Sequence, residues 1–106
     1  MDDFNLGQIQ ELCYMVKRGK PCALMSLKRR YINLAGKICI NEGLKFKTYS
    51  VDDVWDEFWI FKRVEMSKII DELPKEPKSD LDHYLLGAIF GYSHDSICDF
   101  INEINQ

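Results

Sequence analysis

The amino-acid sequence predicts an all-α domain, a compact bundle of about five helices that ends in an angled helix-turn-helix hairpin. Three observations lead to this prediction. Apolar residues recur three and four positions apart along most of the chain, which is the period of an amphipathic helix. Proline and glycine divide this pattern into five segments. The one alternating stretch, residues 44–49, is too short to support a sheet by itself.

The first two helices are predicted over residues 4–18 and 21–43. Asp2 or Asp3 can cap the first helix, and Gly19 ends it. Pro21 suits the first turn of the second helix, because its missing N–H group costs nothing there. The apolar stripe of the second helix consists of Leu24, Leu27, Tyr31, Leu34 and Ile38.

A third helix is predicted over residues 51–73, after an extended connection or at most an edge strand at residues 44–49. Ser50 can cap this helix, and Asp52 and Asp53 would lie in its first turn, where the helix dipole favours negative charge. The helix stops before Pro74, because proline disfavours helical geometry in the residue that precedes it. Residues 75–80 form a polar linker.

The last two helices are predicted over residues 81–90 and 94–104. Ser79 or Asp80 caps the fourth helix and Ser93 the fifth. Gly87 would lie where the two helices touch, and Gly91 would supply a left-handed turn between them. The 106 residues are expected to form a single helical domain, 1–106.

The charge of the chain is unevenly distributed. The net charge is −3, which argues against a globally basic nucleic-acid binder. Residues 1–50 contain nine Lys and Arg and four Asp and Glu, a net charge of +5, whereas residues 51–106 carry a net charge of −8. No apolar run approaches the roughly 18 residues that cross a bilayer, and the first residues are acidic, so we expect a cytoplasmic protein that does not contact a membrane.

No residue pattern predicts an enzyme, a cofactor or a metal site. The four cysteines include no C-x-x-C pair and stand among apolar neighbours, so they are interpreted as reduced, buried thiols. The two histidines, His83 and His94, are 11 residues apart on separate predicted helices, and no ligand set or triad is evident around them. Ser93 is interpreted as a cap and not as a nucleophile, and no glycine-rich phosphate loop occurs.

The start of the predicted third helix is the candidate partner-binding site. Acidic residues surround two tryptophans there, and aromatic anchors ringed by carboxylates suit a basic protein partner. Helix capping and core packing are the alternative explanation. The apolar excess on this helix permits a homodimer as readily as a complex with another protein. The candidate partner-binding residues are Asp52, Asp53, Trp55, Asp56, Glu57 and Trp59.

An alternative site is the basic run Lys28, Arg29 and Arg30 on the predicted second helix. Clustered positive charge is sufficient to bind phosphate groups, so this run could serve a nucleic-acid-binding regulator. The competing interpretation is the solvated face of an amphipathic helix. The predicted fifth helix does not suit a DNA groove, because it contains three acidic residues and no Lys or Arg.

Residues 83–92 (HYLLGAIFGY), followed by Ile97, Phe100 and Ile101, resemble the C-terminal segment of small bacterial immunity proteins of toxin systems. The resemblance covers about the last fifth of the chain, and its residues look structural, so no binding residue can be carried over. It implies a single-domain cytoplasmic protein that neutralises a toxin by binding it, commonly a nuclease with a basic cleft. We therefore expect a non-enzymatic protein-binding inhibitor, such as an immunity protein or antitoxin, that acts through an acidic face.

Overall fold

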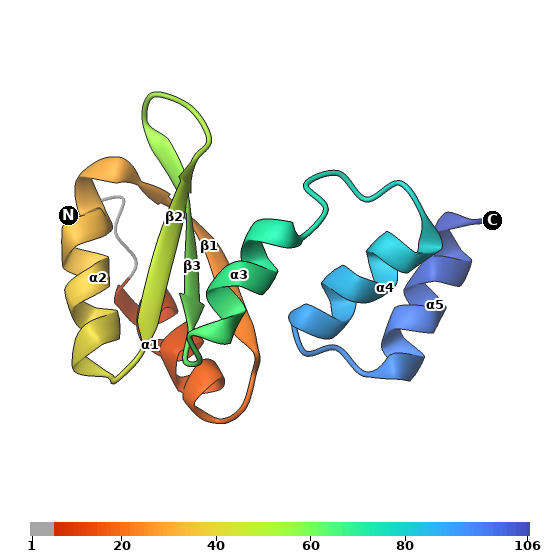
Figure 1. Ribbon diagram of the computed structural model, residues 1–106, viewed down its shortest axis with the longest axis horizontal. Helices are drawn as coiled ribbons and strands as arrows, with labels where there is room; N and C mark the ends of the chain where they lie inside the picture. Colours follow the sequence, from red (N-terminus) through yellow and green to blue (C-terminus); the bar gives the residue numbers. More distant parts are fainter. Residues whose placement is uncertain (1–5) are drawn as a thin grey trace.

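The computed structural model describes residues 6–106 and shows a mixed α/β fold (Figure 1). The described residues form five α-helices, one 3-10 turn and three strands. Their order is α1 (Leu6–Lys17), β1 (Cys22–Lys28), η1 (Arg29–Tyr31), α2 (Ile32–Asn41), β2 (Lys45–Ser50), β3 (Trp55–Phe61), α3 (Glu65–Glu72), α4 (Asp80–Ile89) and α5 (His94–Ile104). The predicted caps Asp2 and Asp3 lie outside the described residues.

The prediction of an all-α fold is wrong, because β1, β3 and β2 form an antiparallel sheet in that order. β3 is the central strand and pairs with both neighbours. A strand that is covered on both faces reads as a nearly continuous apolar run and not as a clean alternation. This explains why the aromatic residues around Trp59 wrap around more of the predicted helix than one apolar stripe requires.

The predicted second helix, residues 21–43, divides into a strand, a 3-10 turn and a shorter helix. Leu24 and Leu27 match the helical spacing, but in β1 they point to opposite faces of the sheet. Pro21 immediately precedes β1, and a proline is tolerated at that position because an edge strand has an unpaired side. Pairing with β3 therefore overrides the local helical pattern, and α2 begins only at Ile32.

The predicted third helix, residues 51–73, divides into a β-hairpin turn, β3 and the short helix α3. Asp52 lies in the turn, where its Oδ1 accepts hydrogen bonds from the backbone N–H groups of Val54 and Trp55, each at 2.8 Å. An aspartate that caps a helix and an aspartate that closes a turn make the same kind of contact. The acidic start of this segment therefore did not distinguish the two structures.

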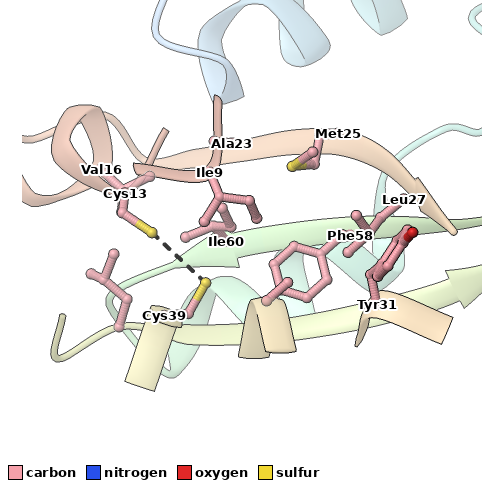
Figure 2. Packing of buried hydrophobic residues seen from close by; sticks show 12 residues of the cluster. Ile9, Cys13, Val16, Ala23, Met25, Leu27, Tyr31, Cys39, Phe58 and Ile60 are labelled. Atoms are coloured by element: carbon pink, nitrogen blue, oxygen red, sulfur yellow. Dashed lines mark hydrogen bonds between the residues drawn. The ribbon is translucent and has the colours of Figure 1, made fainter. Parts of the chain in front are cut away.

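The first hydrophobic core lies between the sheet and helices α1 and α2 (Figure 2). Phe58 and Ile60 of β3 are fully buried in it, and Cys13 Sγ and Cys39 Sγ lie 3.8 Å apart. Phe46 of β2 stacks on Phe58 with ring centroids 5.1 Å apart. A Cβ atom at Gly36 of α2 would lie 2.5 Å from Phe46 Cζ, so only glycine lets α2 approach β2 this closely.

The second core lies on the opposite face of the sheet, against α3 and the end of α4. Trp59 and Phe61 of β3 pack there against Ile70 of α3. Phe90, which follows α4, stacks on Trp59 with ring centroids 5.7 Å apart. The sheet is therefore the middle of three layers. Trp59 is buried in the second core, which forms because residues 55–61 are a strand and not part of a helix.

Helices α4 and α5 form a hairpin at the far end of the molecule (Figure 1). Their bounds agree within one residue with the predicted fourth and fifth helices, and Ser79 and Ser93 cap them through their side chains. Gly87 contacts Ile97, and Gly91 has a φ of 85°. The hairpin is thinly packed, since Ile97 is the one buried residue of its two helices. Among the described residues, no helix is long and apolar enough to span a membrane.

Candidate functional site

The six candidate partner-binding residues do not form one surface. They lie in the β2–β3 turn and along β3, where successive side chains point to opposite faces of the sheet. Trp55 is 37% exposed, whereas Asp56 and Trp59 are 6% and 7% exposed. Asp53 is exposed and Glu57 is half-buried. Among the four carboxylates, Glu57 is the one that lines a groove between the sheet, α3 and α4.

Asp56 forms an ion pair with Arg29 that holds the β2–β3 turn. Arg29 Nη2 donates to Asp56 Oδ1 at 2.8 Å, to Ser50 Oγ at 2.8 Å and to the carbonyl oxygen of Asp52 at 2.7 Å. These contacts raise the pKa of Arg29, with the hydrogen bond to Asp56 as the main cause. The backbone N–H groups of Trp55 and Val54 lower the pKa of Asp52. Asp56 and Asp52 therefore stabilise the fold.

The alternative basic run lies where β1 passes into η1. Arg29 makes the contacts described above, Lys28 Nζ lies 5.7 Å from the centre of the Trp55 ring, and Arg30 Nη2 donates to Tyr31 Oη at 2.9 Å. All three cations have partners within the chain. A phosphate group would have to compete with these contacts, so the geometry gives this surface less support than the groove described next.

A groove of about 630 Å³ opens between the second face of the sheet, α3, the linker after α3 and α4. Its polar part contains the carboxylates of Glu57, Asp71 and Glu76 and the amine of Lys75. Aromatic rings and aliphatic side chains form the rest. The other residues that line the groove are Leu24, Tyr49, Ser50, Val51, Trp59, Ile70, Leu73, Pro74, Leu86 and Phe90.

The two central carboxylates of the groove have different surroundings. Asp71 has a counter-ion, because its Oδ1 lies 2.6 Å from Lys47 Nζ. The same oxygen also accepts a hydrogen bond from Tyr49 Oη. Glu57 Oε1 accepts a hydrogen bond from Trp59 Nε1 at 3.1 Å. Among the described residues, no lysine or arginine lies within ion-pair distance of Glu57. Glu57 is thus a half-buried carboxylate that makes no ion pair with the described residues, although Lys75 lines the same groove.

The α4–α5 hairpin borders the groove, since its residues Leu86 and Phe90 line it. Residues 80–106 contain five acidic residues and no lysine or arginine. Asp95, Asp99 and Glu103 follow one another at four-residue spacing along α5, where like charges destabilise a helix by about 0.2–0.5 kcal/mol per pair. The hairpin also exposes large apolar side chains, namely Leu81, Leu85, Tyr92, Phe100 and Ile104.

The sequence does not predict two clusters of side chains that the structure brings together. The groove joins residues from β1, β2, β3, α3, the linker and α4, and only the alternation of Glu57 and Trp59 along one strand could have suggested part of it. His94 Nε2 lies 3.6 Å from Cys98 Sγ, and His94 Nδ1 lies 3.1 Å from Tyr84 Oη. The four-residue spacing of His94 and Cys98 was the available signal for that contact. No group of metal-ligating side chains suited to an ion occurs within residues 6–106.

Comparisons with family models, with curated proteins and with solved structures found no match to this chain.

Proposed function

We propose that this protein binds a basic protein without catalysing a reaction, and that the groove and the α4–α5 hairpin form the contact surface. An inhibitor such as an immunity protein or antitoxin, which occupies the basic cleft of a nuclease-type toxin, is the function that this surface suits best. The observation that carries the proposal is Glu57, a half-buried carboxylate that makes no ion pair with the described residues.

An uncompensated charge in a partly apolar site costs free energy in the isolated protein. A lysine or arginine of a partner would supply the counter-ion, while its aliphatic stem packs against Trp59 and Phe90. The hairpin supports the same partner chemistry, because its five acids attract positive charge and its exposed leucines and aromatics offer apolar contact. The three stacked acids of α5 repel one another, and a basic partner would relieve that repulsion.

Affinity capture from the native cell lysate, with and without nuclease treatment, tests the proposal. The tagged chain is compared with E57Q, which removes the charge but keeps an oxygen that can accept the hydrogen bond of Trp59. E11Q is the matched control, since Glu11 is an exposed acid on α1. A charged hydrogen bond is worth about 1.5–3 kcal/mol, so E57Q is expected to weaken binding by about tenfold to 150-fold.

A second pair of variants tests the hairpin. The triple change D95N, D99N and E103Q removes the acidic stripe of α5. The control E11Q, E42Q and E65Q removes the same number of charges from other helices or their ends. The stripe variant is expected to lose the salt dependence of binding, and the control is expected to keep it.

One stoichiometric basic protein that the wild type and both controls retain, and that E57Q loses, is the expected result. Equal retention by E57Q and E11Q would contradict the assignment to the groove. Recovery of nucleic acid, or of proteins that disappear after nuclease treatment, would instead favour the alternative function at Lys28, Arg29 and Arg30.

A further inference from the structure

Three side chains of the α4–α5 hairpin form a hydrogen-bonded chain that ends in a thiol. Cys98 Sγ lies 3.6 Å from His94 Nε2, and His94 Nδ1 lies 3.1 Å from Tyr84 Oη. His94 and Cys98 are one turn apart on α5, and Tyr84 reaches them from α4. A nucleophile beside a base, with a third group that orients the base, is the arrangement of an activated nucleophile.

The other three cysteines have a different environment. Cys13, Cys22 and Cys39 are buried, whereas Cys98 is partly exposed. Burial raises the pKa of the Cys22 thiol to about 11 and also raises the pKa values of Cys13 and Cys39. In the folded protein these thiols are therefore protonated and shielded at neutral pH. Only Cys98 combines access to solvent with a base.

We propose that Cys98 is a reactive thiol that undergoes exchange with low-molecular-weight disulfides, and that His94 is its base. His94 Nε2 takes the thiol proton, while the Nδ1–H group donates to Tyr84 Oη. The Cys98 thiolate attacks one sulfur of the disulfide, and the S–S bond of the reagent breaks. The leaving thiolate takes the proton from His94. The products are a mixed disulfide on Cys98 and one free thiol.

The charges around Cys98 favour a role for His94. Asp95 and Asp99 are the acidic neighbours of Cys98 on α5, and Tyr84 is the titratable group that contacts the histidine from α4. Negative charges oppose the formation of a thiolate and favour an imidazolium ion. The acids alone would therefore slow the reaction of Cys98, so a fast reaction requires the proton transfer to His94.

Reaction of the reduced, folded protein with glutathione disulfide tests the proposal, with intact mass and peptide mapping as readouts. The variants are H94Q, Y84F and C98S, and H83Q is the matched control. His83 packs its ring against Phe100, and no hydrogen bond joins it to Cys98 within residues 6–106. Wild type and H83Q are expected to gain one adduct, at Cys98, with equal rates. H94Q is expected to react at least about fivefold more slowly at pH 7, Y84F between the two, and C98S not at all.

The pH profile separates a base from a structural contact. H94Q lacks the group that accepts the thiol proton, so its rate is expected to depend on pH differently from the wild-type rate. Equal rates for wild type and H94Q across pH would overturn the proposal, and so would a Cys98 rate no faster than that of the chain unfolded in denaturant. If H94Q itself unfolds, its buried cysteines react as well and the mass shows several adducts. The rate of Y84F then decides: Y84F must react more slowly than the wild type, and equal rates would overturn the proposal.

Discussion

Replacement of Gly36 by alanine tests the packing of α2 on the sheet. The new Cβ atom would lie 2.5 Å from Phe46 Cζ and 2.6 Å from Cε1, whereas carbon atoms in contact stay about 3.5–4.0 Å apart. Phe46 cannot move away freely, because its ring stacks on the buried Phe58. The overlap of about 1 Å is expected to cost about 1–3 kcal/mol. The better helix propensity of alanine offsets about 1 kcal/mol of this.

G36A should therefore destabilise the protein by up to about 2 kcal/mol, which lowers Tm by roughly 4–8 °C per kcal/mol in a domain of this size. In the background F46A the overlap disappears, and G36A should stabilise by about 1 kcal/mol relative to F46A alone. Chemical and thermal unfolding of the four proteins, followed by circular dichroism, measures the coupling between the two sites. A coupling free energy below about 0.5 kcal/mol would refute the close contact of α2 with β2.

Three further predictions concern the turn and the groove. D56N should lower Tm more than D53N, because Asp56 is buried against Arg29 whereas Asp53 is an exposed side chain of the same turn; equal thermal shifts would contradict a structural role for the pair. The pKa of Asp52 is lowered in the folded protein. The Asp52 carboxylate therefore stabilises the fold above the pKa of the unfolded chain, at about pH 4, and this stabilisation is lost as the pH falls through the pKa of the folded protein. D52N should keep the turn and lose less stability over that acidic range in urea titrations, and an unchanged pH dependence would speak against the hydrogen bonds of Asp52. E57Q should leave the free energy of unfolding unchanged or raise it by up to about 1 kcal/mol, since it removes an uncompensated charge; a clear loss of stability would mean that Glu57 serves the fold.

Local signals predicted the helices at both ends of the chain but not the sheet between them. The predicted first, fourth and fifth helices correspond to α1, α4 and α5, where caps and glycines stand beside a regular apolar period. The sheet depends on contacts between β1 and β3, whose paired residues Cys22 and Phe61 are far apart in sequence. In β3 both faces are buried, so the period-two alternation that identifies a strand is absent.

The same physical reason limits what the sequence predicted about the site. The sequence predicts one helical surface for six neighbouring acidic and aromatic residues. In a strand, however, Asp56 and Glu57 point to opposite faces of the sheet, so Asp56 pairs with Arg29 and Glu57 lines the groove. The charge asymmetry between the two halves was visible in the sequence, and the structure concentrates much of the negative charge in a single hairpin. The remaining groove residues come from elements that only the folded chain brings together.

The most direct measurement of the central claim is a fluorescence titration of the W55F variant with the captured basic partner. Trp59 is then the remaining tryptophan, and its Nε1–H group donates to Glu57 in the groove. Binding at Glu57 should change the Trp59 emission with a Kd that E57Q weakens by at least about tenfold and E11Q leaves unchanged. A saturable emission change with the same Kd in W55F and in W55F with E57Q would contradict the claim that this carboxylate recognises the partner.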